Sequence, residues 1–236
     1  MVKKLGLIGE PYVRELFTGA LLTMDLRRRS IRYRSIQAAY KITYVDRFER
    51  KHFLPPTSID YSGFFELFYA KNIKYIISLT IGTRLHDRIG LGDIVVPHDM
   101  IDLAQLLPLK LEHEVGHLID LGTIFSDKLR KAILQTAESR GIRVVDKAIA
   151  VVTSGLRHET PAEAKAYRAL GGDIIVNHIS AEAFLARIYG MEYLPLVIIA
   201  FDPADKGRKQ GFEEALDIVK SKYNDLRLLI SGLTID

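Results

Sequence analysis

Segments with the composition of buried β-strands alternate with helix-like segments along most of this 236-residue chain. The strand-like segments are rich in Ile, Val and Leu, and they cover residues 5–9, 73–80, 92–96, 144–153, 173–177 and 196–201. This alternation predicts an α/β protein with three layers, in which helices flank a mixed central β-sheet. Because no repeat, low-complexity segment or Pro/Gly-rich linker divides the chain, we expect one domain over residues 1–236.

Capping residues mark the ends of two expected helices. Ser126 can cap a helix that ends before Gly141, and Thr160 stands before a proline and three residues before Glu163, as in a capping box. These signals predict helices over residues 126–140 and 160–170. Further helices are expected over residues 11–23, 60–70, 180–189 and 212–223.

The composition excludes several classes of protein. The chain has no cysteine, which rules out disulfides and thiolate chemistry. Its apolar runs are far too short to span a bilayer, and its first residues lack the long apolar stretch of a signal peptide. We therefore expect a cytoplasmic protein that does not contact a membrane.

The net charge is +4, and an arginine-rich stretch over residues 27–34 carries much of the excess. Ile31, Tyr33 and Ile36 are spaced there like the buried residues of a strand with one solvated face. A solvated hairpin is the simplest interpretation. A nucleic-acid-binding stripe lacks any accompanying recognition motif, so no nucleic-acid partner is expected. A small anionic substrate fits the charge equally well.

A zinc-protease motif occurs at residues 113–117, where His113, Glu114 and His117 match H-E-x-x-H. On a helix, the two histidines would share one face and could bind zinc. The longer form of the motif requires glycine and histidine at the positions of Asp120 and Thr123, so a third ligand is missing. We therefore expect no metal site.

Three groups of residues lie at the carboxyl ends of expected strands. In sheets of this kind, ligands bind beyond the carboxyl ends of the strands, so these residues are candidates for a common site. They are Thr80-Ile81-Gly82, Asn177-His178 and Asp202.

An ordered set of motifs lies within residues 52–102 and 148–205. Its members include Asp60-Tyr61, Gly92-Asp93-Ile94-Val95-Val96, Gly155 with Arg157, Gly172-Asp173 and Glu182-Ala183. The set resembles the trimeric purine nucleoside phosphorylases and, within them, the 5'-methylthioadenosine phosphorylases. The resemblance implies a phosphorylase/hydrolase-like fold and a pentosyltransferase that cleaves the N-glycosidic bond of a purine nucleoside with phosphate.

The resemblance also implies roles for individual residues. Asp202 matches the catalytic aspartate that works on the purine ring, where a carboxylic acid can protonate the departing base. His117 matches a histidine that reaches the active site of a neighbouring subunit, which implies a homotrimer or a hexamer. The remaining matches imply phosphate binding by Gly9, Arg47, Thr80 and His178, and nucleoside binding by Ile81, Gly82, His158, Asn177 and Asp205.

Glu10 departs from the family pattern. The glycine-rich phosphate loop expected after the first strand is Gly9-Glu10-Pro11-Tyr12 here, which brings a carboxylate toward the phosphate. Glu10 can be an acid that favours a helix start, or a general base that activates water, as in related nucleosidases of the wider superfamily.

Four of these residues can instead have ordinary structural roles. Asp202 can simply start a turn, Arg47 can be one more exposed basic residue, and His158 and His178 can be hydrogen-bonded structural histidines.

Three functions therefore stay open. The leading one is a phosphorylase that needs no cofactor and uses inorganic phosphate as co-substrate. The others are a nucleoside hydrolase that uses Glu10, and a nucleoside-binding protein that has lost turnover.

Overall fold

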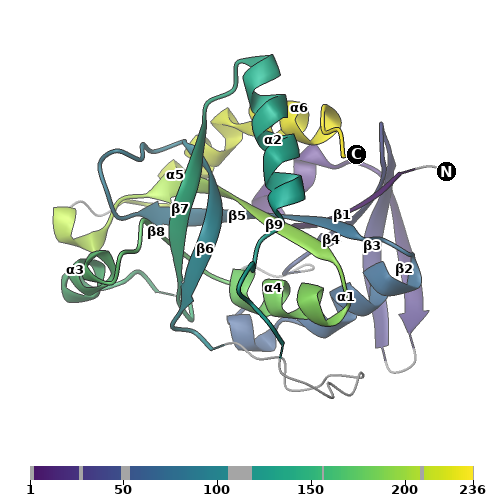
Figure 1. Ribbon diagram of the computed structural model, residues 1–236, viewed down its shortest axis with the longest axis horizontal. Coiled ribbons are helices and arrows are strands. Elements are labelled where there is room, and N and C mark those ends of the chain that lie inside the picture. Colours follow the sequence, from purple (N-terminus) through teal and green to yellow (C-terminus); the bar gives the residue numbers. More distant parts are fainter. Residues whose placement is uncertain are drawn as a thin grey trace.

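A computed structural model describes residues 3–26, 29–48, 54–105, 119–155, 157–207 and 210–235 (Figure 1). The strands in these residues are β1 (Lys4–Gly9), β2 (Ala20–Leu26), β3 (Arg29–Gln37), β4 (Lys41–Asp46), β5 (Tyr75–Arg84), β6 (Ile94–Asp102), β7 (Val144–Val152), β8 (Ile174–Val176) and β9 (Glu192–Phe201). The α-helices are α1 (Tyr61–Ala70), α2 (Asp127–Arg140), α3 (Pro161–Ala169), α4 (Ile179–Ile188), α5 (Phe212–Ser221) and α6 (Tyr223–Ser231). Short 3₁₀ helices are η1 (Pro11–Leu16), η2 (Pro56–Ser58) and η3 (Ala204–Lys206).

The strands form one mixed sheet in the order β2-β3-β4-β1-β5-β8-β7-β6-β9. Strand β1 runs parallel to β4 and β5, and β5 runs parallel to β9, whereas β2, β3 and β4 pair antiparallel in turn. Because β9 pairs with both β6 and β5, the second half of the sheet curls back on itself.

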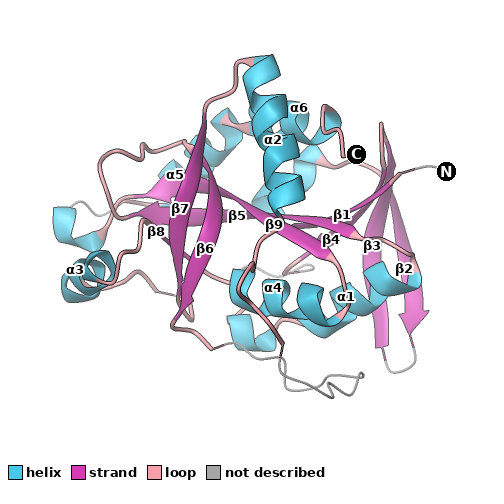
Figure 2. Ribbon diagram, in the orientation of Figure 1, coloured by secondary structure: helices cyan, strands magenta, loops and turns pink. Residues whose placement is uncertain are grey.

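Helices cover the sheet on two sides (Figures 1 and 2). Helices α1 and α4 pack together on one side, and α2 and α6 pack together on the other. The expected α/β fold with a mixed central sheet between helical layers is therefore confirmed. The apolar side chains of β1, β5 and β9 are buried between these layers, as their mainly apolar sequences predict.

The expected helix caps form as the sequence indicates. The Ser126 hydroxyl accepts the Leu129 N–H, and Gly141 ends α2 with φ of 64°, a conformation that glycine adopts at little cost. The Thr160 side chain and Glu163 form a complete capping box at the start of α3.

Two expected helices differ from the structure. The helix expected over residues 11–23 is only the 3₁₀ turn η1, because residues 20–26 pair along their whole length with residues 29–35 of β3. The expected last helix is divided at Lys222 into α5 and α6. In both places, tertiary pairing and packing override the local helical pattern.

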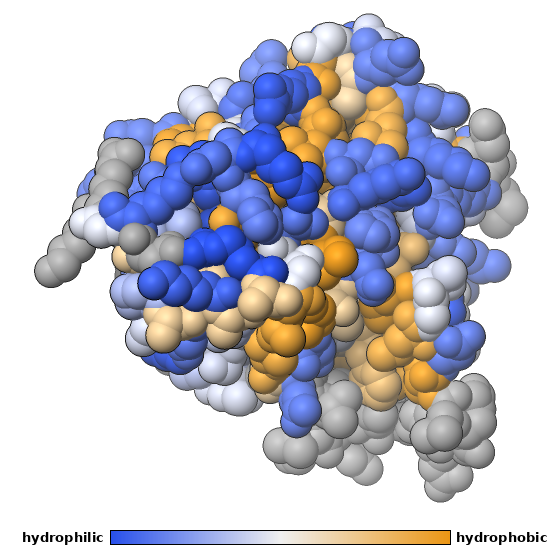
Figure 3. Space-filling model, turned by 60° about the vertical axis from the view of Figure 1, so that its left-hand side comes forward, coloured by the Kyte–Doolittle hydropathy of each residue, from blue (hydrophilic) through white to orange (hydrophobic). Residues whose placement is uncertain are grey.

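The described part of the chain contains no helix with the length and apolarity needed to cross a bilayer. The face that carries α3 is largely hydrophilic, with separate apolar patches between charged side chains (Figure 3).

Gly172 connects α3 to β8 where three segments approach closely. A methyl group there would lie 2.3 Å from Val151 Cγ2 and 3.1 Å from the Tyr167 carbonyl oxygen. We expect Gly172→Ala to lower the free energy of unfolding by about 1–3 kcal/mol, the usual cost of overpacking. Gly90→Ala is the control, because a methyl group at Gly90 meets only the Asp93 side chain, at an ordinary contact distance of 3.5 Å. Chemical denaturation measures both, and equal stability of the two variants would contradict the prediction.

Candidate active site

Arg47 is the centre of a fully buried cluster of charged and polar side chains. Its Nε donates to Glu182 Oε1 at 2.8 Å, its Nη1 to Glu10 Oε1 at 2.8 Å, and its Nη2 to Ser78 Oγ at 2.7 Å. Only 1% of Arg47 is exposed to solvent. The guanidinium group is therefore occupied within the protein.

Topology brings these residues together. Glu10 follows β1 and Arg47 follows β4, and these parallel neighbours pair as far as Gly9 and Asp46. Thr80 lies on β5, the parallel neighbour on the other side of β1. The carboxyl ends of β1 and β4 therefore lie beside Thr80 in the middle of β5, in the region where ligand sites of α/β proteins form.

Two carboxylates share the single charge of Arg47. Thr80 Oγ1 donates to Glu10 Oε1 at 2.6 Å, and the Tyr193 hydroxyl donates to Glu182 Oε2 at 2.7 Å. Burial raises the pKa of Glu10 to about 7, against the opposing effects of Arg47 and of the Thr80 hydrogen bond. Glu10 can therefore gain or lose a proton near neutral pH, as a general base must.

A tight turn at Asn177–Ile179 lies beside this cluster. The Ile179 N–H donates to the Asn177 carbonyl at 2.8 Å, and His178 has φ of 70° and ψ of −34°, which corresponds to the rare γ-turn with positive φ. Backbone strain of this kind concentrates at functional sites.

His178 is buried and held by the Tyr61 hydroxyl, which lies 2.7 Å from its Nδ1. Burial, together with the charge of Arg47, lowers the pKa of His178 well below its usual value, so the imidazole is neutral at pH 7.

Two adjoining cavities open on this edge of the sheet and share Ile81 and Asn177. The larger has a volume of about 340 Å³, and its lining includes Gly82, Thr83, Thr153, Arg157, His158, Glu159, Ile175, Phe201 and Phe212. We call it the cleft. The smaller, of about 50 Å³, is lined by Glu10, Tyr12, Phe48, Leu54, Pro56, Thr80, Gly155 and His178. The cleft therefore adjoins the cavity that Glu10 lines, at Ile81 and Asn177.

Polar and aromatic groups converge in the cleft. His158 packs its ring edge-to-face on Phe201, with ring centroids 4.9 Å apart. The Glu159 side chain accepts the Ala204 N–H at 3.3 Å, and only 8% of this residue is exposed. Thr153 donates to the Asn177 amide oxygen at 3.0 Å. The cleft therefore combines an aromatic wall, a carboxylate and an amide.

Most residues predicted from the sequence gather at these two cavities. The structure brings together Glu10, Thr80, Ile81, Gly82, His158, Asn177 and His178, and Arg47 lies directly behind Glu10. Gly9 is part of the same edge, where its carbonyl accepts the Arg47 N–H at 2.7 Å.

Asp202 lies next to Phe201 but is not among the side chains that line either cavity. Its Oδ1 accepts a hydrogen bond from Arg84 Nε at 2.6 Å. His117, the rest of the H-E-x-x-H motif and the side chain of Asp205 lie outside the described residues. Among the described residues, no group of three or more His, Cys, Asp or Glu side chains could hold a metal ion.

Several residues of the site are not among the site residues predicted from the sequence, including four with polar groups in the Arg47 cluster or the cleft. Ser78, Glu182 and Tyr193 complete the Arg47 cluster, and Glu159 lines the cleft. The sequence does contain a feature that could have identified Glu182, because it is the only acidic residue in the mainly apolar segment of α4. Glu159 directly precedes the cap of α3, where a polar residue is ordinary.

Comparison with known proteins gives the family. The family model described as the phosphorylase superfamily matches residues 47–231, which is most of the chain. The chain belongs to the phosphorylase superfamily. This confirms the family expected from the sequence motifs.

The names of similar proteins describe them as phosphorylases of purine nucleosides. A probable S-methyl-5'-thioinosine phosphorylase of Methanopyrus kandleri is 29% identical over 183 residues, covering 77% of this chain and 72% of the relative. A 6-oxopurine nucleoside phosphorylase of Pyrococcus furiosus is 28% identical over 200 residues, covering 80% of this chain and 75% of the relative.

A solved structure shares the fold. The methylthioadenosine phosphorylase of Schistosoma mansoni, in complex with adenine, superposes with a TM-score of 0.87 at 18% identity, covering 98% of this chain and 90% of that one.

The raised pKa of Glu10 predicts a pH-dependent stability. Between pH 4.5 and about 7, Glu10 is ionised in the unfolded chain but protonated in the fold. The free energy of unfolding should therefore fall as the pH rises through this window, by up to about 3 kcal/mol, and level off above it. We expect Glu10→Gln to remove this fall. Denaturant titrations at pH 5 and pH 8 test this, and an identical pH dependence in both proteins would contradict it.

Proposed function

We propose that this protein cleaves the N-glycosidic bond of a purine nucleoside in the cleft, as a pentosyltransferase of the nucleoside phosphorylase type. The observation that carries this proposal is the continuity of the two cavities at Asn177 and Ile81. A base in the cleft would place its sugar beside Asn177 and direct the glycosidic carbon toward Glu10 and Thr80. A carboxylate there stabilises the cationic sugar that forms as the bond breaks.

The cleft favours a 6-oxopurine base. The buried Glu159 carboxylate can accept a hydrogen bond, and a 6-oxopurine carries an N–H at its N1, whereas the N1 of adenine is itself an acceptor. A base lying against His158 and Phe201 would present this edge to Glu159. The names of the Methanopyrus and Pyrococcus relatives agree with this class of substrate.

The departing base needs a proton or a hydrogen bond. Asp202 is our candidate for this catalytic role, since it directly follows Phe201, which lines the cleft. Rotation away from Arg84 would bring its carboxylate toward the base.

Phosphate is the acceptor that family membership favours. It would enter the small cavity beside Gly9, Thr80 and His178, and it would reach Arg47 only after Glu10 had moved away. The binding of phosphate is therefore coupled to the breaking of the Glu10–Arg47 ion pair.

Water is a second candidate acceptor, and the position of Glu10 favours it. The Glu10 carboxylate already fills the place beside Arg47 and Thr80, lines the small cavity and has a pKa of about 7. A water molecule in that cavity would have a general base within reach.

We propose that the protein assembles as a homotrimer or hexamer, in which His117 of a neighbouring subunit completes the cleft. We also propose that it is located in the cytoplasm. Light scattering of the purified protein tests the assembly.

Analysis of the reaction products distinguishes phosphate from water as the acceptor of the sugar. We expect inosine to yield hypoxanthine, with ribose 1-phosphate if phosphate attacks and free ribose if water attacks. Turnover that requires phosphate identifies phosphorolysis, and equal turnover without phosphate identifies hydrolysis. If inosine raises the melting temperature without any turnover, the protein binds nucleosides but does not cleave them.

Glu159→Gln tests whether Glu159 recognises the base through a hydrogen bond. Loss of the charge on the acceptor should lower kcat/KM for inosine by about tenfold, the difference between a charged and a neutral hydrogen bond, and leave adenosine less affected. Asp202→Asn is the matched comparison, because it should slow both nucleosides. An unchanged preference for inosine over adenosine in Glu159→Gln would remove Glu159 from base recognition.

A further inference from the structure

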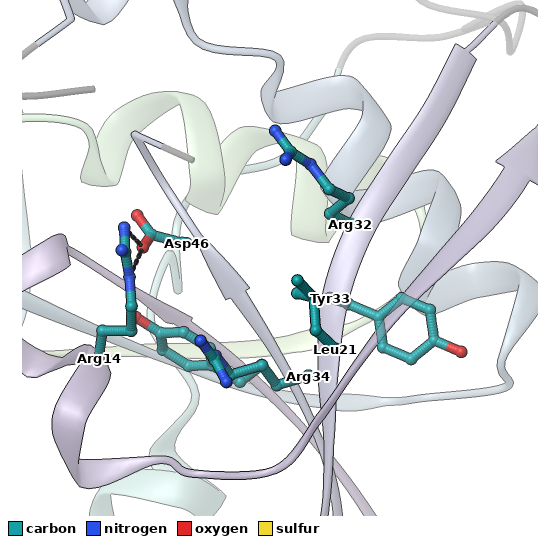
Figure 4. Close-up of a pocket in the computed structure, with 7 residues that line it drawn as sticks. Arg14, Leu21, Arg32, Tyr33, Arg34 and Asp46 are labelled. Carbon is teal, nitrogen blue, oxygen red and sulfur yellow. Dashed lines mark hydrogen bonds and ion pairs between the residues drawn. The ribbon is translucent and has the colours of Figure 1, made fainter. Parts of the chain in front are cut away.

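A separate cavity, of about 140 Å³, lies on the β2–β3 hairpin, and its lining includes three arginines. We call it the hairpin pocket. Figure 4 shows Arg14 approaching from η1 and Arg34 from β3, with Asp46 beside Arg14. The lining residues are Arg14, Leu21, Arg32, Tyr33, Arg34, Tyr44 and Asp46. None of them lines the cleft or the small cavity beside Glu10.

Strand register builds this pocket. Leu21 of β2 lies opposite Arg34 of β3, which lies opposite Tyr44 of β4, so the three side chains share one face of the sheet. Arg32 is two residues from Arg34 and therefore lies on the same face. The ring of Tyr33 points away from Arg14 and Arg34, to the other side of β3 (Figure 4).

Positive charge dominates the lining. Among the lining residues, three carry a guanidinium group and one, Asp46, carries a carboxylate. Two of the arginines are held in place, since Arg14 Nε donates to Asp46 Oδ2 at 2.5 Å and Arg34 Nη1 donates to the Gly19 carbonyl at 3.2 Å. Arg14 and Arg34 are thus ordered beside a space large enough for a tetrahedral oxyanion.

We propose that the hairpin pocket binds a phosphoryl dianion through Arg14, Arg32 and Arg34. Guanidinium groups match the geometry of phosphate oxygens and form charge-assisted hydrogen bonds with them. The exposed side chain of Leu21 offers an apolar contact to the carbon atoms of an organic phosphate.

The hairpin pocket adjoins the active site. The Tyr44 hydroxyl donates to the Glu10 carbonyl at 3.4 Å, and Asp46 directly precedes Arg47. The pocket therefore lies on the far side of the segment that carries Glu10.

Isothermal titration with inorganic phosphate and with glycerol 3-phosphate, at constant ionic strength and without nucleoside, tests this proposal. Binding of phosphate alone identifies the free ion as the ligand, and tighter binding of glycerol 3-phosphate identifies an organic phosphate. We expect Arg32→Gln and Arg34→Gln each to weaken binding by about tenfold. Arg29→Gln is the control, because Arg29 lies on the same strand but pairs with Asp60 and Glu66.

Thr80→Val locates the bound anion. A phosphate in the hairpin pocket is insensitive to this change, whereas a phosphate in the small cavity beside Glu10 loses a hydrogen-bond partner. Absence of binding, or binding unchanged in both Arg32→Gln and Arg34→Gln, would overturn the proposal. Nucleoside turnover is measured separately, so its absence would leave this result intact.

Discussion

The ion cluster around Arg47 constrains the candidate active site more than any other interaction. The Arg47 guanidinium is buried with the carboxylates of Glu10 and Glu182. Removal of these partners would leave an uncompensated buried charge, which is strongly destabilising. The cluster joins the ends of β1 and β4 to α4, and it fixes Glu10 at the wall of the small cavity. An arginine that the resemblance assigns to phosphate is thereby committed to the protein's own side chains.

This arrangement explains how the chain keeps the family fold while its reactive positions differ. A loop that ends in glycines can present backbone N–H groups to an anion, whereas Gly9-Glu10-Pro11 supplies a carboxylate and a residue without an N–H. Three arginines gather elsewhere, around the hairpin pocket. The cleft, in contrast, retains the size and the mixture of aromatic and polar groups that a purine nucleoside needs.

The sequence predicted the layers of the fold, the helix caps and the edge of the sheet where the site forms, because these depend on local patterns and on strand direction. It did not predict that residues 20–26 form a strand, since only pairing with β3 decides that. It identified Glu10, Arg47 and Thr80 separately, but their mutual hydrogen bonds depend on distances between strands far apart in the chain. Glu159 and Glu182 were not predicted as site residues because a single acid in a helix or before a cap has many ordinary roles.

The most direct test is a crystal structure of the protein with a bound inosine analogue that cannot be cleaved. We expect the base to lie against His158 and Phe201 with its N1 hydrogen-bonded to Glu159, and the sugar to lie beside Asn177 with its C1' facing Glu10. A nucleoside bound outside the cleft, or one whose sugar points away from Glu10, would contradict it.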